Sequence, residues 1–340
     1  MSKRITLKMI ADRCGVSTAT VSYALRRSSR IPESTRNRIV EVAQSLGYRP
    51  DPGLSSLAAR KSRNGTVPFY ASVAVLHPNA PESRGYKLFA PHCKYFREKS
   101  LEFGCSITDL QVESDQYRPE RLAQILRTRA IKGILLGWGH WPESIRNFPW
   151  EEFAVISTER TDFGPSIDKV SMNHFHALDD IFAKLSPLPY RRYGLILHDD
   201  CPESTRNNIL GAYQANLFER PILKGDVPPY NYHLGEGPEG MRRWFEEYSP
   251  EVVISHRVID PELFRQAGIQ FPLPTPIVVI EIDEESPIEF SGIYTGSALG
   301  RTVATLLARQ IRTGEIQGNI HRPRLTLVNG TWRDGVTLQI

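Results

Sequence analysis

A pattern of helix, tight turn and helix lies within residues 5–25, and no other feature constrains the fold of this chain as strongly. Thr6 can cap the first helix, and Ser17 can cap the second. Gly15 between them allows the left-handed backbone that a tight turn requires. The inward-facing positions at helical spacing are Leu7, Ile10, Ala11, Val21 and Leu25. The pattern therefore predicts a helix-turn-helix unit, in which a small Ala11 lets two helices cross closely.

The charge of the chain is concentrated at its N-terminal end. Residues 1–63 contain thirteen Lys or Arg and four Asp or Glu, which gives a net charge of +9. Because the whole chain carries +4, the remaining residues carry −5. A basic head on an acidic body favours binding to the phosphates of duplex DNA, with an affinity that falls steeply as salt rises.

A third helix and a short hinge helix follow the helix-turn-helix pattern. Pro32 suits the first turn of the third helix, and Gly47 ends it. Its buried stripe is predicted at Ile39, Val42, Ala43 and Leu46. Pro50 then interrupts the helical pattern, and Asp51 can cap a new helix of about nine residues. A helix this short is below the roughly 12–15 residues needed for stability in water, so we expect a partner to order it. A plain linker is the alternative interpretation.

Residues 4 to about 62 resemble the LacI family of bacterial transcription regulators. The family pattern V-S-x-x-T-V-S matches residues 16–22. The resemblance implies that the second helix enters the major groove, and that Leu57 from a paired hinge helix wedges into the minor groove and kinks the operator. The DNA-contacting positions predicted on this basis are Thr6, Leu7, Ser17, Thr18, Ala19, Ser22, Tyr23, Arg26, Arg30, Thr35, Asp51, Leu54, Leu57 and Ala58.

Strand and helix patterns alternate in the body of the chain. Apolar runs occupy 69–76, 133–137, 153–157, 193–198, 252–255 and 277–282. Amphipathic stretches occupy 95–103, 119–128, 176–185, 205–218, 237–248 and 261–267. This alternation predicts an α/β body with two doubly wound parallel sheets, in which ligands bind beyond the carboxyl ends of the strands.

The resemblance extends into this body and implies two lobes like those of periplasmic sugar-binding proteins. We expect a helix-turn-helix domain at 1–48, a hinge helix and linker at 49–65, and an effector-binding and dimerisation domain at 66–340. One lobe is expected to combine about 66–165 with 293–324. The other is expected to combine about 166–292 with 325–340.

Six residues are predicted to contact a small-molecule effector, a sugar or another metabolite, in the cleft between the lobes: His77, Trp138, Arg206, Asn208, His256 and Asp283. The sequence departs from the family pattern here. The family has an arginine three residues before the glycine at 211, whereas this chain has Asn208 there and an arginine at 206. Bidentate recognition of a sugar by arginine and aspartate is therefore not predicted.

Several other chemistries are not supported by the sequence. The four cysteines lack metal-binding spacing, which favours a reduced cytoplasm. His174 and His176 lack a third ligand at suitable spacing, so neither a metal site nor a cofactor is predicted. No catalytic motif points to an enzyme. There is also no apolar run long enough to cross a membrane and no signal peptide, so we expect a cytoplasmic, nucleoid-associated protein.

These observations together predict a homodimeric regulator that binds a palindromic double-stranded operator, with repression the favoured outcome. Two alternatives stay open at this stage. One is a DNA-binding regulator whose cleft binds no effector, and the other is an enzyme with a Rossmann-like body.

Overall fold

The computed structural model describes most of the chain in two compact units, Met1–Pro68 and Phe69–Ile340. The described residues are 7–25, 31–46, 70–78, 84–112, 118–137, 139, 141–158, 167–198, 201–223, 225–232, 238–269, 275–282, 289–316 and 322–338. The side chains of Ser22, Gln44 and residues 84–88 lie outside this description. The predicted hinge helix at 49–65 also lies outside the described residues, as do Thr6, Arg26, Arg30, Trp138 and Asp283.

The N-terminal unit contains three helices around a small apolar core. They are α1 (Leu7–Cys14), α2 (Thr18–Leu25) and α3 (Glu33–Ser45). The predicted left-handed turn is confirmed, because Gly15 has φ of +63°. The predicted cap is confirmed as well, because the Thr20 amide donates to Ser17 Oγ at 3.0 Å. The core includes Ile10, Ala11, Val21, Ala24, Ile39 and Ala43.

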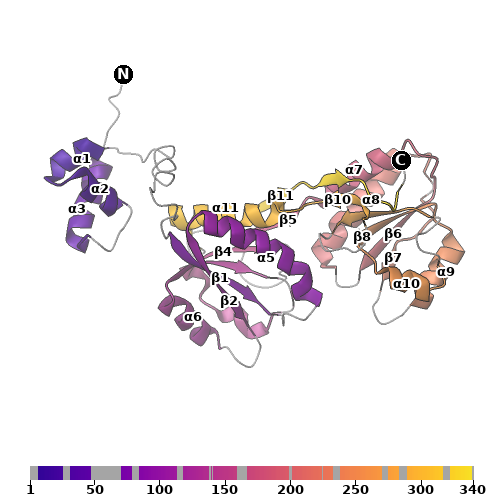
Figure 1. The fold of residues 1–340 in the computed structure, drawn as a ribbon, viewed down its shortest axis with the longest axis horizontal. Helices are drawn as coiled ribbons and strands as arrows, with labels where there is room; N and C mark the ends of the chain where they lie inside the picture. The colour runs from indigo at the N-terminus through magenta and orange to yellow at the C-terminus, as the bar shows by residue number, and fades with distance from the viewer. Residues whose placement is uncertain are drawn as a thin grey trace, which may run out of the picture. The chain divides into compact units, whose positions relative to one another are not determined.

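The first sheet of the body consists of six parallel strands in the order β11-β5-β4-β3-β1-β2 (Figure 1). Its strands are β1 (Ala71–His77), β2 (Cys105–Gln111), β3 (Ile131–Leu136), β4 (Ala154–Thr158), β5 (Asp168–Met172) and β11 (Leu325–Val328). Its helices are α5 (Arg84–Glu102), α6 (Pro119–Thr128) and α11 (Ala298–Thr313), with short 3₁₀ turns η1 (Glu143–Asn147) and η2 (Trp150–Glu152). The sheet is covered on both faces, because Val73 packs with α5 and α11 while Leu76 packs with α6.

The second sheet also has six strands, in the order β12-β10-β9-β8-β6-β7, and only β12 is antiparallel. Its strands are β6 (Tyr193–His198), β7 (Tyr230–Tyr232), β8 (Val252–Arg257), β9 (Ile277–Glu281), β10 (Ser291–Tyr294) and β12 (Thr331–Arg333). Its helices are α7 (His174–Leu185), α8 (Glu203–Glu219), α9 (Pro238–Tyr248) and α10 (Pro261–Gln266). The first two cover one face and the last two cover the other.

Two strands fall on the other side of the expected lobe boundaries. The sequence placed residues from 166 and from 325 in the second lobe, but β5 and β11 pair with each other in the first sheet. The expected return to the first lobe at 293 is also early, because β10 extends to Tyr294 in the second sheet. The three crossovers therefore follow β5, β10 and β11. Strand pairing decides these boundaries, and the amino-acid composition does not indicate which sheet a strand joins.

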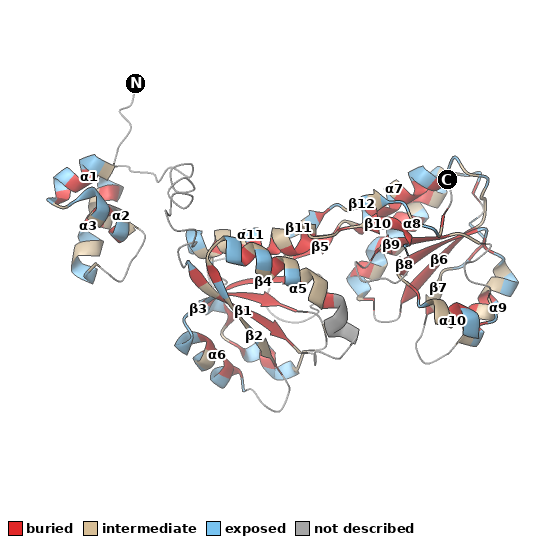
Figure 2. Ribbon diagram, viewed as in Figure 1, coloured by how far each residue is buried: buried red, intermediate tan, exposed pale blue. Residues whose placement is uncertain are grey.

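The buried parts of both sheets account for the runs of apolar sequence. Figure 2 shows the central strands as buried ribbons and the helices with one buried side each, whereas the edge strands β2, β11 and β12 are partly exposed. In the second lobe the rings of Phe182 and Tyr193 stack with their centroids 5.3 Å apart, and the Tyr213 hydroxyl donates to the Tyr193 carbonyl at 2.8 Å. Burying each such apolar side chain stabilises the fold by roughly 1.5–3 kcal/mol.

One buried charge network joins three segments of the first lobe. Asp168 accepts hydrogen bonds from the Gln310 amide at 2.9 Å and from the Arg324 backbone and guanidinium at 2.8 and 2.9 Å. These bonds fix the start of β5 against α11 and β11. Because the carboxylate is fully supplied with donors, its charge is tolerated in the interior.

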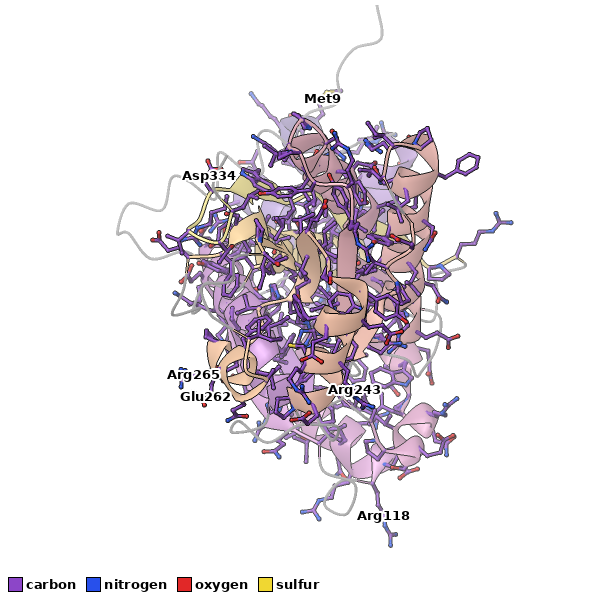
Figure 3. All side chains as sticks on the ribbon, turned by 90° about the vertical axis from the view of Figure 1, so that its right-hand side faces the viewer. Met9, Arg118, Arg243, Glu262, Arg265 and Asp334 are labelled. Atoms are coloured by element: carbon purple, nitrogen blue, oxygen red, sulfur yellow. The ribbon has the colours of Figure 1, made fainter. Side chains whose placement is uncertain are left out.

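The ion pairs of the described residues lie partly within single helices and partly between neighbouring elements. Glu262 and Arg265 lie side by side on α10 (Figure 3), where their side chains form an ion pair. Exposed pairs of this kind contribute between zero and about 1 kcal/mol each, so they do not determine the fold. Among the helices that the structure describes, none combines the length and apolar character needed to cross a bilayer.

Candidate nucleic-acid interface and effector site

The first candidate site is the outer face of α2 in the N-terminal unit. Ser17, Thr18, Ala19 and Tyr23 are all exposed there, while Val21 is buried behind them. Ser17 is held by its own helix, since its hydroxyl accepts from the Thr20 amide. The face thus presents short hydroxyl and methyl groups at the helix start, with one phenol a turn further on.

These groups suit the edges of base pairs. A serine or threonine hydroxyl can donate to or accept from a base, and a methyl group can contact the thymine methyl in the major groove. The tight packing of α1, α2 and α3 holds this face in place. Leu7 and Thr35, two further predicted contacts, are half-buried at the starts of α1 and α3.

The second candidate site is the carboxyl edge of the second sheet. Four neighbouring strands end there in polar side chains, at His198, Tyr232, Arg257 and Glu281. The strand register places His198 beside Tyr232, and Arg257 beside Glu281. Doubly wound sheets bind their ligands at this edge. Buried polar groups in such number are costly unless they serve a ligand or one another.

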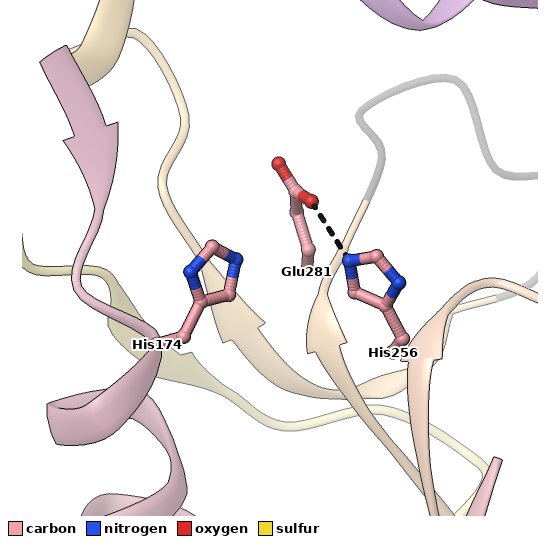
Figure 4. A group of neighbouring side chains, drawn as sticks. All are labelled: His174, His256 and Glu281. Carbon is pink, nitrogen blue, oxygen red and sulfur yellow. Dashed lines mark ion pairs between the residues drawn. The ribbon is translucent and has the colours of Figure 1, made fainter. Parts of the chain in front are cut away.

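Two histidines and one glutamate converge at this edge. The ligating atoms of His174, His256 and Glu281 all lie within 4.8 Å of one another. His256 Nε2 is 3.9 Å from Glu281 Oε2, and the rings of His174 and His256 have centroids 6.2 Å apart (Figure 4). His198 continues the group, with its ring centroid 6.2 Å from that of His256.

The local sequence explains how His174 reaches this group. The chain leaves the first sheet after β5, and Asn173 then caps α7 by accepting from the His176 amide at 3.2 Å. Asn173 also donates to Asn329 Oδ1 at 2.9 Å, which joins the first crossover to the one after β11. His174 is therefore the first residue of α7 and is held next to two crossovers.

The structure brings together only part of the predicted effector set. His256 lies in the polar group, whereas Arg206 is half-buried and Asn208 is exposed on α8. His77 lies buried at the end of β1 in the first sheet. The other two predicted contacts, Trp138 and Asp283, are outside the described residues.

Sequence reasoning missed His174, His198 and Glu281. It set His174 aside because no third ligand stood at suitable spacing, but the structure supplies Glu281 from a strand far along the chain. The available signal was positional, since each of these residues ends a strand or begins the helix after one. The cysteines do not join the group. All four are buried, and burial raises the pKa of the Cys105 thiol to about 11.

Comparison with known proteins identifies the N-terminal unit. Residues 6–51 match the family of bacterial regulatory proteins called the lacI family. Catabolite control protein A of Streptococcus mutans is 25% identical over 245 residues, which cover 70% of this chain and 69% of that protein. The transcriptional regulator PtxS of Pseudomonas plecoglossicida is 23% identical over 284 residues, 78% of each chain.

Solved structures of similar fold cover nearly the whole chain. A complex of the transcriptional regulator CelR with cellobiose has a TM-score of 0.57 at 18% identity, and covers 98% of this chain and 100% of its own. The lac repressor dimer bound to operator and an anti-inducer has a TM-score of 0.55 at 15% identity, with 98% and 99% covered. At these identities the likeness concerns the fold.

The described chain combines a three-helix N-terminal unit with a body of two α/β lobes, and the solved regulators named above share this architecture. Within this chain, residues 6–51 match the LacI family of bacterial regulatory proteins, and the body has the fold of the solved structures named above. The relatives named above are transcriptional regulators.

Proposed function

We propose that this protein is a sequence-specific transcriptional regulator that binds a palindromic operator as a homodimer and represses the genes beside it. The observation that carries this proposal is the exposed face of α2 at Ser17–Tyr23, within the stretch that matches the family. A two-fold dimer would place one such helix in each of two major grooves, roughly one helical turn of DNA apart.

The predicted hinge supplies the second part of this proposal. Asp51, Leu54, Leu57 and Ala58 lie outside the described residues, so their roles rest on the sequence. An apolar Leu57 inserted in the minor groove would unstack one base step at a cost of a few kcal/mol, which contacts along the bent DNA offset. Arg26 and Arg30 are proposed as phosphate contacts.

We further propose that a small molecule regulates the protein from the carboxyl edge of the second sheet. His256 is the predicted effector residue that the polar group at this edge supports best, and Arg206 on the neighbouring helix α8 is a second candidate. Relatives of the same fold were solved with cellobiose and with sucrose. Binding there would shift the balance between body conformations by the difference in affinity for each.

The proposal assigns no catalytic reaction to this chain. The polar groups at the second edge are assigned to binding, and the protein would act on DNA in the cytoplasm, in association with the nucleoid. A regulator with no effector is the alternative, and the several buried polar groups at one sheet edge favour a liganded site over it.

The DNA-binding proposal is tested by selecting bound sequences from a random duplex pool with the full-length protein at near-physiological salt. We expect a palindromic site, and we expect exchanging Thr18 and Ala19 to change the preferred bases in both half-sites. Gln124→Ala, on the exposed side of α6 in the body, is the control and leaves the preference unchanged. Failure to enrich any duplex sequence would refute the proposal.

A further inference from the structure

The group formed by His174, His256 and Glu281 has the composition of a metal site. Its ligands come from three separate segments, the start of α7 and the ends of β8 and β9. Two imidazoles and one carboxylate are a donor set that holds zinc in proteins while leaving a coordination position open. The same set with open positions also occurs around other divalent transition metals.

The distances permit such an ion after a small contraction. The three ligating atoms lie within 4.8 Å of one another, and His256 Nε2 is 3.9 Å from Glu281 Oε2. Zinc bonds of about 2.0–2.1 Å in a tetrahedral site bring ligand atoms to roughly 3.4 Å from each other. An ion bound by all three residues therefore requires these separations to shorten by between about 0.5 and 1.4 Å.

Burial gives the site its selectivity. His256 is 0% exposed and His174 is 3% exposed, whereas the Glu281 side chain retains 19% exposure. The histidines are thus removed from bulk water, whereas the carboxylate keeps some contact with it. Arg257 lies beside Glu281 in the strand register and is the nearest guanidinium in the sequence to His256. A metal ion gains two imidazole bonds that a guanidinium cannot form.

We propose that His174, His256 and Glu281 bind a divalent transition-metal ion, with zinc as the representative. The open coordination position would accept an oxygen donor from a small effector, and this last role rests on the proposed function. Metal binding itself does not depend on that function. The effector is therefore either the metal ion itself or a metabolite whose oxygen atoms coordinate the bound metal ion.

The position of His174 connects this site to the crossovers. Its neighbour Asn173 bonds to Asn329 in the crossover after β11, so an ion on His174 would tie both crossovers to the edge of the second sheet. The difference in metal affinity between body conformations then sets how strongly the ion biases them. Zinc is thus expected to alter operator affinity.

The test is calorimetric titration of zinc into metal-free full-length protein, with a competing chelator of known affinity. We expect one ion per chain, with affinity at least about 100-fold weaker in His256→Ala and in Glu281→Gln. His176→Ala is the matched control, because His176 is two residues from His174 on the same helix but its side chain is 46% exposed and faces Asp180. This control keeps the full affinity.

Folding and function are read separately from metal binding. Thermal unfolding of each variant without metal checks that it folds, and Glu281→Gln, which keeps the side-chain shape, decides the matter if His256→Ala unfolds. Absence of stoichiometric zinc binding, or zinc binding unaffected by Glu281→Gln, would overturn the metal site. Operator affinity with and without zinc is then measured: an unchanged value overturns the effector role, and no operator binding at all refutes the proposed function instead.

Discussion

The two sheets of the body have corresponding strand orders, apart from the antiparallel β12, but they differ at their carboxyl edges. In the first sheet the strands end in three apolar and three polar residues, which are Leu136, Met172, Val328, His77, Gln111 and Thr158. In the second sheet neighbouring strands end in histidine, tyrosine, arginine and glutamate. Nearly the same strand order is thus built twice, once with an edge that mixes apolar and uncharged polar residues and once with an edge that brings a histidine, an arginine and a glutamate together.

This difference distinguishes the residues that stabilise the fold from those that are available to bind a ligand. Both sheets keep apolar side chains along their central strands, because burial of those side chains stabilises each lobe. The polar groups of the second edge contribute nothing comparable, and each carries a desolvation cost. Such groups are the ones to expect at a binding site. In the first lobe, by contrast, the buried carboxylate of Asp168 is structural, because it bonds β5 to α11 and to the start of β11.

The largest expected effect comes from adding one methyl group to each sheet. In Gly292→Ala the new Cβ would lie 2.0 Å from the Val279 carbonyl oxygen, and the backbone φ of +150° is unfavourable for alanine. We expect a loss of more than about 4 kcal/mol, or failure to fold. The matched change in the first sheet, Gly133→Ala, meets the mobile end of Ile311 at 2.7 Å and should cost about 1–3 kcal/mol.

Chemical denaturation of the two variants measures this contrast. The second sheet is expected to be far less tolerant, because backbone cannot yield and a side-chain terminus can. Equal losses of unfolding free energy in the two variants would contradict this expectation, and would show that the two sheets accommodate an added methyl group equally well.

A smaller effect is expected where the chain passes from the first sheet to the second. Asn173→Ala removes both the cap of α7 and the bond to Asn329, and should cost about 1–2 kcal/mol. Asn329→Ala removes only the shared bond and should cost about 0.5–1.5 kcal/mol. Unfolding free energies of both single variants and the double variant form a cycle. A coupling energy of zero would mean that the crossovers are not joined through these side chains.

The smallest effect concerns acid stability of the first lobe. Hydrogen bonds hold the pKa of Glu315 below its ordinary value of 4.5, and the bond from Arg324 has a larger effect than the bond from Thr313. A carboxylate with a lowered pKa adds stability above its unfolded-state pKa, and loses it as pH falls through the folded value. Glu315→Gln should therefore cost less than about 1 kcal/mol at neutral pH.

That cost is expected to diminish as the pH falls below the ordinary pKa of 4.5 and through the lower folded-state pKa of Glu315, because the wild-type carboxylate then becomes protonated. The measurement is the difference in unfolding free energy between wild type and Glu315→Gln across pH 3–7. A difference that stays constant with pH would show that the charge of Glu315 plays no part, and that only its shape matters.

Local sequence predicted several elements well, and the reasons are visible in the residues. The helix at Pro119–Thr128 and the strand at Tyr193–His198 match their predicted bounds, because a clear period and a starting proline or a continuous apolar run define them. The helix expected from Tyr95 instead begins at Arg84, since α5 continues through Pro91, which ordinarily interrupts a helix. Tertiary packing overrides that local preference.

Other elements lack a local signal altogether. The edge strand β2 carries Ser106, Thr108 and Asp109, so its apolar period is weak, and it exists because it pairs with β1 along its length. Strands as short as β7 and β10 are likewise specified by their neighbours. The role of each predicted DNA contact and effector contact stays a prediction.

By itself the sequence determined the helix-turn-helix head, its turn at Gly15, its cap at Ser17 and the alternating α/β body, because each depends on residues close together in the chain. Only the tertiary structure decided which strands share a sheet and which side chains meet at its edge. His174 gains His256 and Glu281 as neighbours through strand order, and no sequence spacing encodes a contact made by pairing distant strands.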